Sequence, residues 1–442
     1  MDMRGRHVPA NKIPDHVRDR VRSHIRSFPV YESHYSRNTT SKQFLGSELS
    51  IEKMYCLYKE KCSEEDISKS EIVKSWLYRH IFKTEFNLSF KVPSVDTCDQ
   101  CDTFKIKIQE CSDENEKLQL SQDHNDHLRD AENRYSEKRK DKERREKTKV
   151  IVLDLQKCLP TPYLSNSRAF YFLKLWTLNL TIYDATDKKS YCFVWDESQA
   201  GRGGHEIASV ILKWVEGFLI DTDTETLIIW SDNCPSQNRN IMMLVNYFYL
   251  LQIKCPSLKR IIHKFLLRGH THMEADHIHA LIERVIKKQP TMKICTPWDW
   301  QQLIRSTGAT VIEMQLSDFK NYESLYSGSG SPLIHKKQTV DKEVFLISSA
   351  VWLEIRREDP GVLYYKTEIL QDDYKMVNMN RSPRRMIGLP LELHPLRTTS
   401  KNISIKKYNH LITLLQWVPV QFHDFYKNMT VGAQQGDDDD DD

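Results

Sequence analysis

The chain has 442 residues, of which 39% are hydrophobic and 28% charged, the composition of a globular protein with solvated segments and length for about two to four domains. No apolar run approaches the roughly 18–20 residues that span a bilayer, and the first residues lack the apolar core of a signal peptide. We therefore expect neither a membrane-spanning nor a secreted protein. The ten cysteines should then stay reduced, as metal ligands or buried thiols.

The formal net charge is +3, but the chain without its acidic C-terminal end is more strongly basic. The last six residues are aspartates, and removing them from the 61 acidic residues leaves 55 against 64 basic residues, a charge of +9. Basic residues gather at the N-terminus and around 138–149. This asymmetry favours a polyanionic partner such as DNA.

Residues 1–95 are expected to be mainly helical. Val17, Val21 and Ile25 recur at helical spacing with arginines between them, and further helical patterns cover 49–62 and 70–86. Short helices that expose arginines are typical of a DNA-binding module. A helical bundle whose arginines are merely solvated fits the same pattern, and both interpretations stay open.

Residues 96–149 begin with a candidate zinc site. Cys98 and Cys101 have the C-x2-C spacing of a zinc knuckle, and His124 and His127 would complete a set of four ligands. We favour a structural zinc ion over two unliganded thiols. Other thiols compete for the same role: Cys56, Cys62 and Cys111.

From residue 112 to 149 the chain is almost wholly polar. This composition predicts a solvated helix or a linker. Its closing basic cluster would also serve as a nuclear-import signal, so we expect the protein in the nucleus.

An α/β pattern starts at residue 150 and continues to 325. Apolar runs and amphipathic stretches predict the order β-β-β-α-β-α-β-α. The expected elements are a strand at 149–157, a hairpin at 170–198 that turns at 184–189, helices at 203–219, 237–252 and 272–288, and strands at 226–234 and 258–269. Mixed sheets of this order carry ligands beyond the strand ends.

A smaller α+β region is expected at 333–430, after the polar stretch 326–332. Strand patterns at 344–355 and 361–370 and a closing helix within 408–426 support it. Residues 431–442 form an acidic tail that should be disordered.

Three motifs in this α/β segment carry a family resemblance: LDLQK at 153–157, WSDNC at 230–234 and GHTHMEADHIHALIER at 269–284. With the strand order, they resemble the ribonuclease H-like core of DDE/DDD transposases and integrases. More closely, the chain is similar to transposon-derived proteins of animal genomes, which also begin with a Cys-pair-bearing helical region. The resemblance implies an α/β fold with a mixed sheet, and DNA cutting and joining with two magnesium ions.

Two carboxylates stand where such chemistry needs them. Two metal ions activate the attacking oxygen and neutralise the leaving one, and magnesium prefers hard oxygen ligands. Asp154 ends the first strand, and Asp232 ends the strand expected beside it. The alternative for each is a turn residue or the cap of the next helix.

The last helix must supply the third acid, and it offers Glu274, Asp276 and Glu283. Helical spacing places Glu274 within the apolar stripe, whereas Asp276 lies off this stripe and near the start of the helix. Glu283 shares that side but follows about 10 Å along the axis. We select Asp276 as the third magnesium ligand and keep Glu283 in reserve.

Other polar residues near these acids have open roles. Four histidines crowd the last helix and could orient phosphate, shuttle a proton or bind a transition metal: His270, His272, His277 and His279. Three amides follow Asp232 and could bind DNA phosphate or cap a helix: Gln237, Asn238 and Asn240.

The leading expectation is therefore a DDE/DDD-type transposase-like enzyme with magnesium or manganese as cofactor. Double-stranded DNA is its expected partner, and a homo-oligomer is a further expectation. The alternative is a domesticated transposase that has lost catalysis and acts as a DNA-binding protein. A third hypothesis is a nuclease acting on RNA or hybrids.

Overall fold

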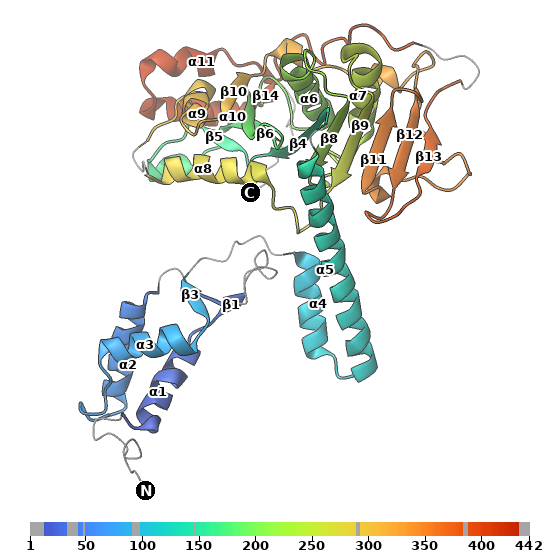
Figure 1. The fold of residues 1–442 in the computed structure, drawn as a ribbon. Coiled ribbons are helices and arrows are strands. Elements are labelled where there is room, and N and C mark those ends of the chain that lie inside the picture. Colours follow the sequence, from blue (N-terminus) through green and yellow to red (C-terminus); the bar gives the residue numbers. More distant parts are fainter. Residues whose placement is uncertain are drawn as a thin grey trace. The chain divides into compact units, whose positions relative to one another are not determined.

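The computed structural model describes residues 13–32, 43–46, 49–90, 98–144, 146–288, 292–382 and 388–432. Most of the predicted acidic tail lies outside these residues. The chain divides into two compact units, Met1–Ser121 and Gln122–Asp442, and each is described by itself. Figure 1 labels the elements of both units. No helix among these described residues is long and apolar enough to cross a membrane.

Three helices form the core of the first unit, as the sequence predicts. They are α1 (Asp15–Arg26), α2 (Ile51–Glu64) and α3 (Ser75–Glu85), followed by α4 (Asp99–Glu110). The apolar stripe of α1 is buried against α2 and α3, because it places Val17, Val21 and Ile25 on one face. Ser50 caps α2 by accepting a hydrogen bond from the amide of Lys53 at 3.1 Å. A small sheet of three short strands was not predicted: β1 (Tyr31–Glu32), β2 (Gln43–Leu45) and β3 (Leu88–Phe90).

The arginines of α1 bind acids of the same unit. Arg22 contacts Glu85 through its Nε at 2.6 Å, and Arg20 contacts Glu71 at 3.3 Å. These pairs join α1 to α3 and to the segment before it. Such contacts are what the helical-bundle interpretation expects of the arginines.

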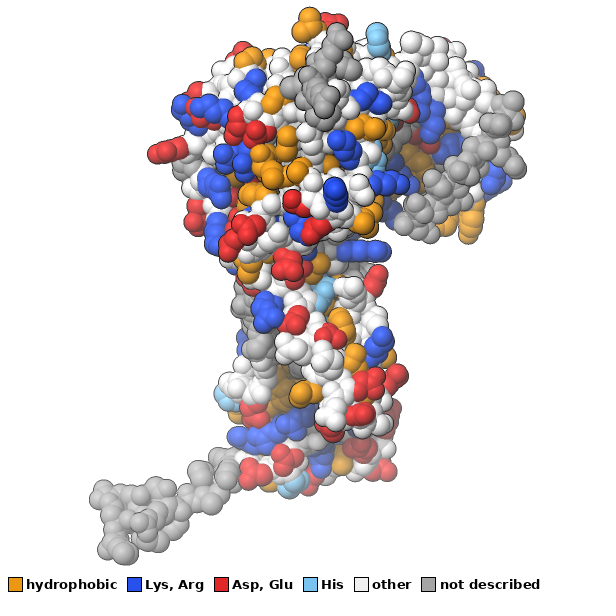
Figure 2. Space-filling view, turned by 90° about the vertical axis from the view of Figure 1, so that its right-hand side faces the viewer, with side chains coloured by type: hydrophobic (Ala, Val, Ile, Leu, Met, Phe, Trp, Pro, Cys, Tyr) orange, Lys and Arg blue, Asp and Glu red, His pale blue; other side chains and the backbone are white. Residues whose placement is uncertain are grey.

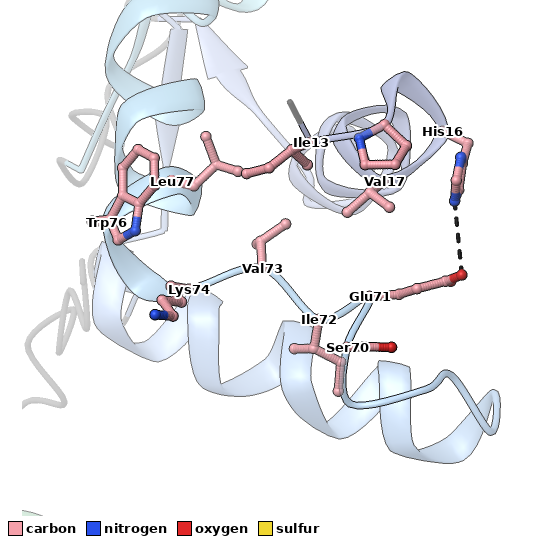
Figure 3. Close-up of a pocket in the computed structure, with 11 residues that line it drawn as sticks. Ile13, His16, Val17, Ser70, Glu71, Ile72, Val73, Lys74, Trp76 and Leu77 are labelled. Carbon is pink, nitrogen blue, oxygen red and sulfur yellow. Dashed lines mark ion pairs between the residues drawn. The ribbon is translucent and has the colours of Figure 1, made fainter. Parts of the chain in front are cut away.

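A cavity of about 360 Å³ opens between the start of α1 and the segment that leads into α3. Figure 3 shows Ile13, Val17 and Leu77 around it, with His16 and Glu71 paired at its rim, 3.9 Å apart. Its walls are largely apolar and carry few groups that could take part in catalysis.

A ten-stranded mixed sheet organises the second unit. Its order is β10-β7-β6-β4-β8-β9-β11-β12-β13, and the short strand β5 pairs with β6. The strands are β4 (Thr148–Leu155), β5 (Leu159–Thr161), β6 (Leu175–Asp184), β7 (Lys189–Asp196), β8 (Thr226–Ser231), β9 (Arg260–Phe265), β10 (Thr310–Glu313), β11 (Trp352–Arg356), β12 (Val362–Lys366) and β13 (Lys375–Asn378). The β6–β7 hairpin turns at the predicted place, and β4, β8 and β9 run parallel.

The predicted smaller region at 333–430 is not separate from this sheet. Strand β11 pairs with β9 in the antiparallel sense, so β11, β12 and β13 extend the sheet. The first part of the expected strand at 344–355 forms a short 3-10 turn instead, Ile347–Ser349. The polar stretch at 326–332 is therefore a connection within one unit rather than a boundary.

Helices cover both faces of the sheet. Ile151 and Leu153 of β4 point to the face packed by α6 (Gly204–Phe218) and α7 (Ile241–Tyr249), whereas Val150 and Val152 point to the opposite face. That opposite face is packed by part of α5 (Glu114–Glu143), α8 (Glu274–Lys288) and α9 (Pro297–Arg305). Figure 1 shows α6 and α7 on one side of the strands and α8 on the other. Two covered faces explain why β4 and β8 read as continuous apolar runs. Two further helices follow near the end: α10 (Ile405–Leu414) and α11 (His423–Lys427).

The C-terminal half of α5 corrects the expectation of a solvated helix or linker. Arg134, Lys138 and Asp141 are buried although the helix is strongly polar. Asp141 accepts hydrogen bonds from Lys264 at 2.6 Å and from the indole of Trp230 at 3.0 Å. Charge pairing rather than apolar periodicity therefore fixes this helix to the sheet, and a hydrophobicity pattern could not reveal it.

We predict that Asp141→Ala destabilises the second unit by about 3 kcal/mol, because it leaves the fully buried ammonium of Lys264 with one carboxylate fewer. Asp126→Ala, which removes an exposed pair on the same helix, should cost no more than about 1 kcal/mol. Urea unfolding followed by tryptophan fluorescence measures both. Equal losses in the two variants would contradict the role of the buried pair.

We also predict an acid-sensitive first unit. His24 is buried with its Nδ1 2.9 Å from the Tyr78 hydroxyl, and burial lowers its pKa from the ordinary 6.5 to about 4. As the pH falls, His24 binds a proton in the unfolded chain before it does so in the folded protein. The free energy of unfolding therefore keeps its full value above pH 6.5 and decreases as the pH drops toward 4. Hydrogen exchange of α1–α3 amides at pH 7 and pH 5 measures the loss. It should be smaller in His24→Gln, and an identical loss in that variant would exclude His24 as its source.

Candidate functional site

The three predicted acids converge at one edge of the large sheet. Asp154 is the penultimate residue of β4, and Asp232 directly follows β8, which is parallel to β4, so both carboxylates leave the sheet at the same end. Asp276 lies in the first turn of α8, which contacts β4 and β6. We call Asp154, Asp232 and Asp276 the carboxylate cluster.

Asp154 and Asp276 lie close enough to share a cation. Together with His279 they each offer a ligand atom, and these atoms all lie within 4.8 Å of one another. Burial raises the pKa of Asp154 well above its ordinary value, and the charges of Asp276 and Asp232 raise it further. The charge of Asp276 also acts to raise the pKa of Asp232, after the larger effect of burial. The three carboxylates are therefore electrostatically coupled, although Asp232 is outside the tightest group.

Asp232 is held by its own loop. Its Oδ1 accepts hydrogen bonds from the amide of Cys234 at 3.2 Å and from the side-chain amide of Asn238. The first of these bonds is an Asx turn, the structural alternative considered from the sequence. Asn238 is buried, and its Oδ1 has no hydrogen-bond partner among the described residues. A buried amide that fixes one carboxylate oxygen leaves the other oxygen available for a ligand.

Asp276 both caps α8 and faces the cluster. Its Oδ2 accepts a hydrogen bond from the amide of Met273 at 2.7 Å and lies 3.5 Å from Nδ1 of His272. Burial acts to raise its pKa, but these contacts and the nearby imidazoles outweigh burial, so the pKa is lowered. Within this pair, the pKa of Asp276 is therefore lowered and that of Asp154 is raised.

His279 is the site residue that the sequence analysis undervalued. It is buried one turn after Asp276, with its Nδ1 3.7 Å from Asp154 Oδ2 and its Nε2 3.0 Å from the Thr181 hydroxyl. Burial lowers its pKa to about 4, so the imidazole is neutral near pH 7 and keeps a lone pair. Its i, i+3 spacing from Asp276 was the sequence signal, since such residues share a helix face.

The other candidate residues have different surroundings. Glu283, the reserve acid, is exposed and lies 3.5 Å from Lys287. Glu274 pairs with Lys138 at 2.7 Å rather than with the cluster. Asn240 caps α7 by accepting from the amide of Met243 at 3.1 Å. His277 is exposed on α8, so the four histidines do not form one site.

The candidate zinc ligands lie in both units. Cys98 and Cys101 are buried at the start of α4 in the first unit. In the second unit, Nε2 of His127 lies 3.1 Å from Nε2 of His270, a residue outside the predicted set of four ligands. His124 lies one turn before His127 on α5.

The donor atoms of the cluster fit a divalent cation. Carboxylate oxygens suit magnesium and manganese alike, and a neutral imidazole favours manganese over magnesium. The side chains gathered here could therefore hold a metal ion.

Comparison with known proteins gives one match. The model of a domain of unknown function, DUF7869, matches residues 184–341. The matched segment contains Asp232, Asp276 and His279, and it begins after Asp154. No curated protein and no solved structure matches the chain.

We predict that Asn238→Ala weakens Mn²⁺ binding by about 10–100-fold, because Asp232 loses the donor that orients it. Asn240→Ala is the matched control. It should cost about 1 kcal/mol of stability through the lost cap while leaving Mn²⁺ affinity unchanged. Calorimetric titration and thermal unfolding separate the two effects. Unchanged affinity in Asn238→Ala would show that Asp232 needs no such support.

Proposed function

We propose that the protein is a DDE/DDD transposase-like enzyme that cuts and joins DNA phosphodiester bonds with two divalent metal ions. The observation that carries the proposal is the convergence of Asp154, Asp232 and Asp276 from two parallel strand ends and a helix start. Coupled carboxylates at a sheet edge repel one another unless cations bind between them.

The order of elements supports a ribonuclease H-like core. From β4 to α8 the long elements follow the order β-β-β-α-β-α-β-α, the order that carries the resemblance. In space, β4 is central between β6 and β8, and β6 is antiparallel to β4 whereas β8 is parallel. Asp154 therefore lies on the middle of these three strands.

Each residue of the cluster would have a distinct part in the reaction. Asp154, Asp232 and Asp276 would together hold the divalent ions. Bound divalent ions activate the attacking water or 3′-hydroxyl and neutralise charge on the leaving oxygen. His279, neutral near pH 7, would add a nitrogen ligand or accept a proton beside Asp154.

The substrate follows from charge and from the resemblance. The body of the chain is basic, which favours a polyanion such as duplex DNA, and a nuclear location belongs to the same proposal. On the face drawn in Figure 2, Lys and Arg side chains are interspersed with Asp and Glu. Contact with DNA should then be made by separate basic residues rather than by one continuous basic patch on this face.

We predict that Asp154→Asn lowers Mg²⁺- or Mn²⁺-dependent nicking of supercoiled DNA by at least about a thousandfold, since it would remove a carboxylate ligand and several kcal/mol of transition-state stabilisation. Asp232→Asn and Asp276→Asn should act alike. Glu283→Gln, an exposed change on the same helix as Asp276, is the control and should nick normally. Gel separation of nicked from supercoiled plasmid gives the rates.

Two outcomes would replace this proposal. DNA binding without nicking in any divalent metal, with no Mn²⁺ bound by the wild-type chain, would favour a catalytically inactive DNA-binding protein. Preferential cutting of RNA or RNA–DNA hybrids in a competition assay would instead indicate recognition of the 2′-hydroxyl.

A further inference from the structure

A pair of histidines joins α5 to the loop between β9 and α8. His127 of α5 and His270 of this loop bring their Nε2 atoms to 3.1 Å, with ring planes at 64°. Zn–N bonds of about 2.0–2.1 Å at a tetrahedral angle separate two ligand nitrogens by about 3.3–3.4 Å. The pair therefore has the spacing of two imidazoles bound to one ion.

The loop is shaped to present His270 toward α5. Residues 267–270 form a tight turn in which the amide of His270 donates to the carbonyl of Leu267 at 2.8 Å. Gly269 occupies the turn with φ of 76°, a conformation that favours glycine. Tyr135, two turns after His127 on α5, donates its hydroxyl to the carbonyl of His270 at 3.0 Å.

Both imidazoles suit a metal. His270 is buried and His127 is partly buried, so both imidazole rings are shielded from bulk solvent. Neutral imidazole is a preferred ligand of zinc and other late transition metals. Magnesium prefers oxygen, so this pair differs in chemistry from the carboxylate cluster.

We propose that His127 and His270 bind a zinc ion, distinct from the metal site of the carboxylate cluster. The site does not depend on the proposed enzymatic function. It fixes α5 to residues 266–273, the loop that leads directly into the first turn of α8 and hence to Asp276.

Zinc content of the purified full-length chain tests the proposal. The protein is stripped with a chelator, dialysed against Zn²⁺ and analysed by atomic emission. Wild type should retain tightly bound zinc, whereas His127→Gln and His270→Gln should each lower the zinc affinity by at least about tenfold. His270→Cys should restore binding, because a thiolate also binds zinc. This rescue separates loss of a ligand from loss of the fold.

Matched variants identify the ligands. His124→Gln, one turn away on α5, and the exposed His277→Gln should keep their zinc. Absence of zinc binding by wild type, or full retention in both His127→Gln and His270→Gln, overturns the proposal. The same holds if only Cys98→Ser/Cys101→Ser loses zinc. Asp154→Asn should keep its zinc, so failure of the nicking proposal and failure of this one are distinguishable.

Discussion

Mutual repulsion among three partly buried carboxylates at one edge of the sheet governs the chemistry that the second unit can support. Asp154, Asp232 and Asp276 come from different elements; the charges of Asp276 and Asp232 act on Asp154, and that of Asp276 acts on Asp232. An isolated buried carboxylate is costly, and adjacent ones are more so unless protons or cations intervene. The surrounding contacts from Asn238, Met273 and His272 hold this arrangement in place. Such an electrostatic cost to stability is typical of a binding site and not of a scaffold.

A buried charge network joins α5 to β9, on the face of the sheet that α8 also covers. Lys264 of β9 is enclosed by Asp141 and Glu137 of α5 and lies 3.6 Å from the ring centre of Trp352. The same helix reaches the start of α8 through Lys138 and Glu274. Thus α5 contacts both the sheet and the helix that carries Asp276. Its polar surface, which looks solvated in the sequence, is the surface by which it is fixed.

Much of the fold and of the carboxylate cluster was predictable from residue patterns. The β6–β7 hairpin, α1 to α3 and the positions of Asp154 and Asp232 at strand ends follow from periodicity of two or of 3.6 residues. Asp276 was separated from Glu274 and Glu283 by its angle from the apolar stripe, and the structure places these three acids in different surroundings. Short strands such as β5 and the attachment of β11 to β9 were missed, because strand pairing between distant segments leaves no local signal.

The sequence by itself determined the α/β class, the strand ends that bear acids and the helix start that bears Asp276, because each depends on neighbouring residues. Only the tertiary structure decided which polar residues meet. Asn238 could have bound phosphate but supports Asp232, and His270 approaches His127 across 143 positions of the chain. His279 joins the acids because α8 packs over β4 and β6, and its hydroxyl partner Thr181 lies on β6. Contacts between polar groups far apart in sequence require the fold, since no periodicity encodes them.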